Sequence, residues 1–156
     1  MNLDQQIKDW VEKEINGKDI FFVDLEVKPG FKRLEISLLL DTMEGIQIED
    51  CAKVSRGLSN WIEENNLIAE AYNLEVSSPG IDKPLKYDWQ FEKNKGRKIK
   101  IWMKEEENME GELEGKEGEE IIFFKEKRHK HLVKKEKEAT RVSLDKIDKI
   151  KVQVSF

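Results

Sequence analysis

The chain has 156 residues, of which 39% are charged and 38% are hydrophobic, and its formal net charge is −5. This length allows one domain or two small ones, and the modest apolar content favours small cores. A single cysteine, Cys51, excludes an internal disulfide and a cysteine-built zinc or iron–sulfur site. No apolar run approaches the roughly 20 residues that cross a bilayer, and no basic-then-apolar leader opens the sequence. We therefore expect a cytoplasmic protein without a membrane partner or a cofactor.

The chain begins with the pattern of a helix followed by a hairpin. Apolar residues on one helical face predict a helix that starts near Leu3 and stops before Gly17. Two runs that alternate apolar and polar residues lie on either side of Pro29-Gly30, which is typical of two paired strands. Asp24 and Glu26 are expected to be solvated carboxylates on the outward face of the first strand. Its inward residues are then Phe21, Val23, Leu25 and Val27.

A second helix and a third strand follow. Apolar residues recur every three or four positions over residues 48–64, which predicts an amphipathic helix whose cap, Gln47, is weak. Residues 72–77 alternate like a half-buried strand. Helix, strand, strand, helix, strand favours an α+β domain with two helices on one face of a small sheet.

A proline-bounded stretch predicts a joint between two domains. Pro79 and Pro84 each fix their own φ and lack an amide donor, and Gly80 can take the positive φ of a turn. Division here gives domains 1–84 and 85–156. The first holds 9 Lys and Arg against 17 Asp and Glu, and the second holds 19 against 16. The two domains thus differ in the sign of their net charge.

The second half predicts a small all-β domain. Short alternating runs occur at 98–102, 109–115, 121–124, 140–144 and 150–154, and 143–147 is compatible with one helical turn. Five short strands with this spacing are typical of an SH3-like or Sm-like barrel. Gly111 and Gly115 flank Leu113, where a missing Cβ permits a sharp bend.

Ser77 and Ser78 allow three interpretations. They could mark a strand end and a turn, supply a nucleophile, or belong to a phosphate-binding loop. The context of a nucleophile elbow and the fingerprints of nucleotide-binding loops are absent, and Pro79 removes an amide that a phosphate cradle would use. We therefore predict that the protein is not an enzyme.

Residues 125–141 carry 8 Lys and Arg against 3 Asp and Glu in an acidic protein. The segment is either a solvated hairpin loop or a contact for phosphate, and the sequence does not choose between them. His129 and His131 lack further ligands that could be placed from sequence, so we predict no metal site. The candidates for contact with RNA are Lys125, Lys127, Arg128, Lys130, Lys134 and Lys135.

The run Leu-Glu-Val-Ser-Ser-Pro-Gly-Ile-Asp-Lys-Pro-Leu over residues 74–85 resembles the hallmark segment of the RimP family of bacterial ribosome maturation factors. Ile81 and Lys83 stand where the family usually has Leu and Arg. The lysine-rich segment and the acidic loop 105–107 are less typical of it. Other stretches that resemble the family are residues 22–26, 50–56, 111–115 and 143–152.

The resemblance implies a non-catalytic assembly factor that binds the immature small ribosomal subunit near its decoding region. It implies contacts with the basic ribosomal protein of that region and with small-subunit ribosomal RNA, made by a monomer. The alternative is a stand-alone Sm-like RNA-binding regulator. Under the first interpretation the residues expected at the partner surface are Arg56, Glu75, Ser77, Ser78, Gly80, Asp82 and Lys83.

Overall fold

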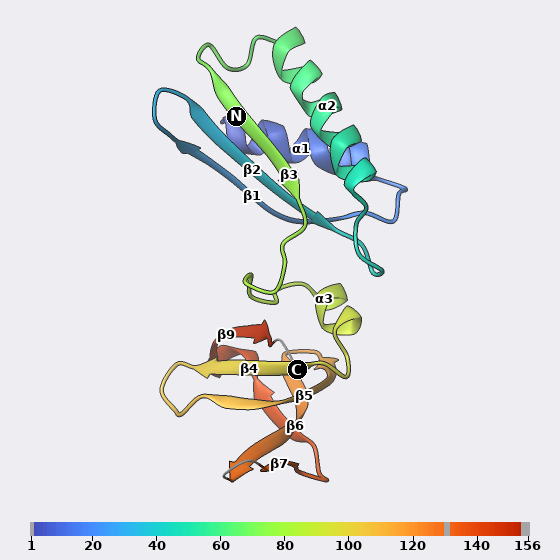
Figure 1. Cartoon of the computed structure of the whole chain (residues 1–156), viewed down its shortest axis with the longest axis vertical. Helices are drawn as coiled ribbons and strands as arrows, with labels where there is room; N and C mark the ends of the chain where they lie inside the picture. The colour runs from blue at the N-terminus through green and yellow to red at the C-terminus, as the bar shows by residue number, and fades with distance from the viewer. Residues whose placement is uncertain (1, 130–131, 154–156) are drawn as a thin grey trace. The chain divides into compact units, whose positions relative to one another are not determined.

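A computed structural model describes residues 2–129 and 132–153, with the side chains of Arg128 and His129 left undescribed (Figure 1). The chain divides into two compact units, Met1–Pro79 and Gly80–Phe156. The division falls at Pro79, whereas the sequence analysis placed it after Pro84. No helix in the described ranges has the length and apolar character needed to span a membrane.

The first unit has the predicted order of elements. These are α1 (Leu3–Ile15), β1 (Phe21–Pro29), β2 (Leu34–Asp41), α2 (Ile48–Glu64) and β3 (Tyr72–Ser77). The sheet order is β1-β2-β3; β1 and β2 form an antiparallel hairpin, and β3 runs parallel to β2. α2 is therefore the crossover that returns the chain to the same end of the sheet, as a parallel pair requires.

Both helices of this unit cover one face of the sheet. Ile7 and Val11 of α1 and Leu58 of α2 are fully buried in one cluster with Ile36 and Leu38 of β2. Trp10 and Trp61 stack in this layer with ring centroids 5.9 Å apart. In Figure 1 the strands lie in front of α1, and α2 lies beside them on the right.

A β-bulge corrects the predicted inward face of β1. The pairing of β1 with β2 shifts between Phe22 and Asp24, which leaves Val23 as the extra residue. Phe22, Leu25 and Val27 therefore pack against the helix-facing core, whereas Phe21 and Val23 do not belong to that cluster. The prediction was wrong because alternation by two cannot anticipate an inserted residue.

The two helices start differently. The Oδ1 atom of Asn2 accepts a hydrogen bond of 2.9 Å from the amide of Gln5 and caps α1. Gln47 makes no side-chain bond at the start of α2, as predicted, and Glu49 and Asp50 in the first turn favour the positive end of the helix dipole instead.

The second unit is mostly β-structure and begins with a short helix. Its elements are α3 (Asp88–Lys93), β4 (Lys98–Met103), β5 (Met109–Glu117), β6 (Glu120–His129), β7 (Leu132–Lys135), β8 (Thr140–Ser143), the 3₁₀ turn η1 (Leu144–Lys146) and β9 (Ile147–Val152). The predicted helical turn is confirmed. The described residues of this unit form six strands instead of the predicted five, because the lysine-rich segment extends β6 and adds β7. The last strand begins at Ile147, and Val154 lies outside the described residues.

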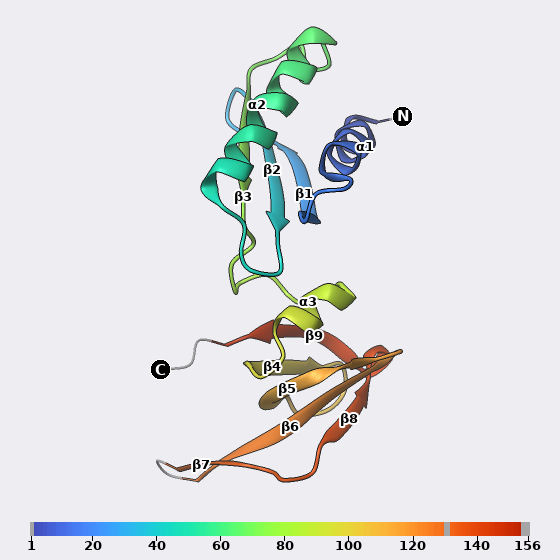
Figure 2. The same cartoon turned by 90° about the vertical axis from the view of Figure 1, so that its right-hand side faces the viewer.

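The sheet of this unit curls around its own core. Its path is β7-β6-β5-β4-β9, with β8 also paired to β6 (Figure 2). Val142 of β8 and Ile150 of β9, near opposite ends of that path, are buried in one cluster with Phe123 and with Phe91 of α3. No pairing joins β8 to β9 in the described part of the chain. The unit is thus an all-β domain on one core, and its closure as an SH3-like or Sm-like barrel stays a prediction.

Gly111 allows a close approach rather than the bend that the sequence suggested. A Cβ atom at this position would lie 2.3 Å from the backbone oxygen of Phe124 and 2.8 Å from the ring of Phe123. The irregularity of β5 lies next to Gly115 instead, where the register with β6 shifts after Leu113.

We expect Gly111→Ala to lower the free energy of unfolding by about 1–3 kcal/mol, because the added methyl group meets rigid backbone. Gly115→Ala is the matched control, since its nearest atom is the flexible Cε of Lys95 at 3.2 Å. Urea unfolding followed by circular dichroism measures both variants. Equal midpoints for the two variants would contradict the packing argument.

Candidate functional site

The face of the three-stranded sheet that the two helices do not cover presents three rows of paired residues. Strand register places Glu26, Ser37 and Glu75 side by side in the middle row. We call the whole set the open sheet face; its other two rows are Asp24, Leu39 and Ser77, and Lys28, Glu35 and Asn73. A depression of about 620 Å³ lies over the middle row and the row of Lys28, Glu35 and Asn73.

Acidic side chains dominate the open sheet face. It carries four carboxylates and one ammonium group, that of Lys28, whose Nζ lies 3.6 Å from Glu26 Oε1. Asn73 donates a hydrogen bond of 3.2 Å to Glu35 and accepts one of 3.1 Å from Arg33. Glu75 is exposed and has no ion-pair partner among residues 2–129 and 132–153. Glu75 can therefore attract a cationic partner without first breaking an internal ion pair.

The structure brings only some of the predicted partner-binding residues together. Ser77 and Glu75 lie on β3 at the open sheet face, and Ser78 follows as an exposed residue. Arg56 is exposed on α2, on the other side of the sheet from Glu75. Gly80, with φ +64°, and the exposed Asp82 and Lys83 belong to the second unit and form its entry turn.

The lysine-rich segment forms the β6–β7 hairpin, which carries lysine side chains on both of its faces. Lys127 pairs directly with Lys134, and the strand alternation places Lys125 on the same face. Lys135 lies on the other face, where it bonds Glu112 and stands 5.4 Å from the centroid of the Phe124 ring. Lys130 lies outside the described residues, and so does the side chain of Arg128. Of the candidates for RNA contact, only Lys125, Lys127 and Lys134 share a described surface.

Lys127 and Lys134 face each other across the β6–β7 strand pair, where like charges are unfavourable. Lys127 is partly neutralised by Glu136 at 3.6 Å, whereas Lys134 is exposed and has no carboxylate partner in the described ranges. This face of the hairpin could therefore accept an anion.

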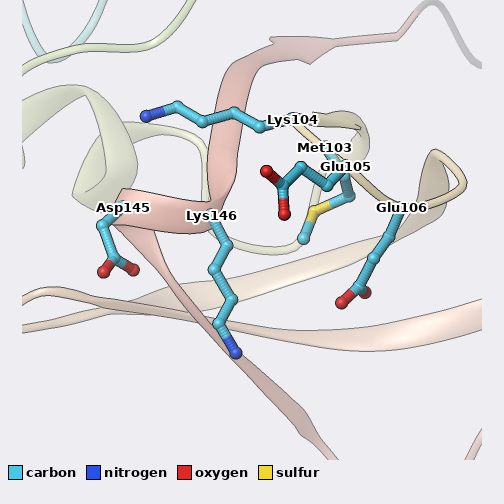
Figure 3. Close-up of a pocket in the computed structure, with 6 residues that line it drawn as sticks. All are labelled: Met103, Lys104, Glu105, Glu106, Asp145 and Lys146. Carbon is cyan, nitrogen blue, oxygen red and sulfur yellow. The ribbon is translucent and has the colours of Figure 1, made fainter.

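A second depression, of about 220 Å³, lies between the β4–β5 loop and η1. Its charged residues are Lys104, Glu105, Glu106, Asp145 and Lys146. In Figure 3 the charged ends of Lys104, Glu106 and Lys146 point in different directions instead of converging on one point. No group of three metal-ligating side chains occurs in the described part of the chain. This arrangement therefore offers no set of groups that would act together on one ligand atom.

Cys51 is buried at the start of α2. Burial is the main cause that raises the pKa of its thiol, and the carboxylates of Asp50 and Asp41 raise it further. A thiol with a raised pKa is a poor nucleophile at neutral pH, because the thiolate is the reactive form.

Comparison with known proteins identifies the family. Residues 10–82 match the domain family described as the RimP N-terminal domain. A protein of Cytophaga hutchinsonii named ribosome maturation factor RimP is 34% identical over 121 residues, which cover 76% of this chain and 72% of that protein. The chain belongs to the RimP family. The match to the RimP N-terminal domain ends at residue 82 and so includes β3 and most of the joint.

Sequence analysis missed that the acids of the RimP-type first unit form one surface. It treated Asp24 and Glu26 as separate solvated groups and did not connect Glu35 with Glu75. The available signal was the polar alternation of three neighbouring strands. Reading it required the strand order and the register, which the sequence did not provide.

Cys51 should react with a thiol reagent more slowly in the folded protein than in the unfolded chain at pH 8. Its folded pKa lies above the ordinary value of 9.0, so the protonated thiol contributes stability that is lost as pH rises through the folded pKa. Because the chain has one cysteine, colorimetric thiol labelling reports this group alone. Asp50→Asn should lower the thiol pKa; equal labelling rates in buffer and in denaturant would contradict the assignment.

Proposed function

We propose that this chain is a non-catalytic ribosome maturation factor that binds the immature small ribosomal subunit and promotes its maturation near the decoding region. Membership of the RimP family supports the role, since the relative from Cytophaga hutchinsonii is named a ribosome maturation factor. Bacterial ribosome assembly takes place in the cytoplasm, so the protein acts there, and it acts as a monomer.

The open sheet face is the observation that carries this proposal. Four carboxylates within three adjacent strands create a negative potential on a unit that is itself acidic. Such a surface speeds the encounter with a cationic protein and selects against anionic ones. The partner it fits is the very basic ribosomal protein of the decoding region.

The second unit supplies the contact with small-subunit ribosomal RNA. It carries the excess of basic residues, and Lys125, Lys127 and Lys134 share one face of the β6–β7 hairpin. Two units of opposite net charge can thus hold a basic protein and an RNA at the same time. The chain segment that joins the two units contains four of the proposed partner-binding residues, Ser78, Gly80, Asp82 and Lys83. Arg56 adds an exposed positive charge on α2.

A binding role agrees with the environments of Cys51 and Ser77, whose side chains carry nucleophilic atoms. The pKa of Cys51 is raised. Ser77 is half-buried in a strand pair with Leu39. Neither residue has the activated setting of a nucleophile.

The second candidate function is a stand-alone Sm-like RNA-binding regulator. The cationic hairpin face favours it, because that surface would bind free RNA without a ribosomal partner. It predicts tight binding to free RNA, whereas the first proposal predicts a preference for immature subunits.

Reversing two charges of the open sheet face tests its role. The double variant Glu26→Lys, Glu75→Lys should slow association with the purified basic ribosomal protein by about tenfold at low salt. Stopped-flow fluorescence measures the rate. The matched control, Glu12→Lys with Glu64→Lys, makes the same change of net charge on exposed helix positions and should have a smaller effect. Equal slowing by both pairs would show that net charge, and not this face, steers the partner.

Sedimentation separates the two candidate functions. The protein should co-migrate with immature small subunits and not with mature ones on a sucrose gradient. Tight binding to free RNA without this preference would favour the regulator instead. Replacing Lys125, Lys127 and Lys134 by Gln should reduce co-migration; Lys53→Gln, an exposed lysine of α2, should leave it unchanged.

A further inference from the structure

A tryptophan on the outer face of the second sheet is surrounded by three lysines. In the antiparallel pair of β4 and β9, Trp102 lies opposite Lys149, and Lys100 lies opposite Lys151. The Nζ atoms of Lys149, Lys100 and Lys151 are 4.9, 5.0 and 6.0 Å from the centroid of the Trp102 ring. We call these four residues the Trp102 cluster.

The cluster faces away from the core of its unit. Ile99, Ile101 and Ile150, which alternate with cluster residues along the two strands, are buried in the hydrophobic core. The four cluster residues themselves are half-buried. The side of the sheet that carries Trp102 is therefore the side open to a partner.

The three lysines have no carboxylate within ion-pair distance in the described part of the chain. Glu110, opposite Lys100 on β5, is the acid closest in register. Lys98 shows the contrast: it is also on the outer face of β4, and its Nζ lies 3.4 Å from Glu126. Ion pairing thus neutralises one end of this face and leaves the Trp102 cluster cationic.

Protein stability alone explains this arrangement poorly. Lysine stems can cover an exposed ring, and an ammonium group above a tryptophan ring is a weakly stabilising contact at an exposed site. Placing Lys100 directly opposite Lys151 works against that gain, because like charges in a cross-strand pair repel. A ligand that brings both a flat ring and negative charge would relieve the repulsion.

We propose that the Trp102 cluster binds single-stranded RNA, with an unpaired base stacked on Trp102 and the neighbouring phosphates held by the three lysines. Stacking of a base on an aromatic side chain is favourable, and the ammonium groups that leave the ring gain contacts with phosphate in exchange. The lysine stems are flexible, so the ammonium groups can move from the ring to phosphate oxygens. Duplex RNA keeps its bases stacked inside and cannot use the ring. An acidic peptide would pair with the lysines but leave the ring without a flat partner.

This site lies apart from the hairpin face invoked above, because its residues belong to β4 and β9. It rests on the proposed function only for the source of the RNA, an unpaired segment of ribosomal RNA. The binding chemistry can therefore be tested with synthetic RNA and the full-length chain.

The experiment is fluorescence anisotropy with a short labelled oligouridylate over a range of salt concentrations. Trp102→Leu should weaken binding by about 5- to 100-fold without changing the salt dependence, because stacking is uncharged. Trp102→Phe should retain most of the affinity. Lys149→Gln with Lys151→Gln should weaken binding and reduce the salt slope by about 0.7 for each lysine. Lys86→Gln is the control, since that single lysine lies 5.3 Å from the centroid of the Tyr87 ring and should have no effect.

Equal affinity for oligouridylate and for duplex RNA would overturn the proposal, as would stronger competition by polyglutamate than by unlabelled RNA. Unchanged binding by the two lysine replacements would overturn it even if Trp102→Leu failed to fold. Oligouridylate binding through Trp102 without co-migration with immature subunits would refute the proposed function and leave this site intact. Co-migration with immature subunits without oligouridylate binding through Trp102 would overturn this site and leave the proposed function intact.

Discussion

The alternation of side chains along a β-strand is the constraint on which both units depend. In β2, Ile36 and Leu38 are buried beneath the two helices, so Glu35 and Ser37 must project from the opposite face. The register with β1 and β3 then aligns those polar residues with Glu26 and Glu75. Burial of one face thus creates the acidic surface on the other. The acidic surface is thus formed by the same three strands that form the core, without an additional loop or helix.

The same rule operates in the second unit with the opposite charge. Ile99 and Ile101 of β4 fill the core, and Lys100 and Trp102 project outward. β9 repeats the pattern with Ile150 inside and Lys149 and Lys151 outside. The small size of each core leaves a large share of every strand at the surface, so the identity of the outward residues decides the character of the unit.

Sequence periodicity predicted most elements because the helices and strands obey their own repeats over several residues. α1, α2 and the β1–β2 hairpin lie where the apolar patterns placed them. The errors occurred where one residue or a register decided the outcome. The bulge at Val23 inverted part of the expected face of β1, and the charged segment after Phe124 hid a strand pair that alternation of apolar residues could not reveal.

The candidate sites were harder to predict than the fold, because they depend on pairings between distant segments. Residues 74–85 pointed to the family and to the joint, yet Glu75 acquires its acidic neighbours only through β2 and β1. Trp102 occupies the penultimate position of β4, and its three lysines come from two strands that are far apart in sequence. Local patterns therefore identified single residues, whereas the surfaces required topology.

Dissolved salt weakens the electrostatic contribution of these surfaces to binding but not the contribution of aromatic stacking. Attraction between the open sheet face and a basic protein, and between lysines and phosphate, weakens over a Debye length of about 8 Å at physiological ionic strength. Stacking on an aromatic ring is not screened in this way. A surface that relied on charge alone would associate quickly with a partner of opposite charge and dissociate from it quickly at this ionic strength. In the proposed RNA site, stacking on the ring of Trp102 therefore adds a contact that slows dissociation, while the lysines of β4 and β9 govern the encounter.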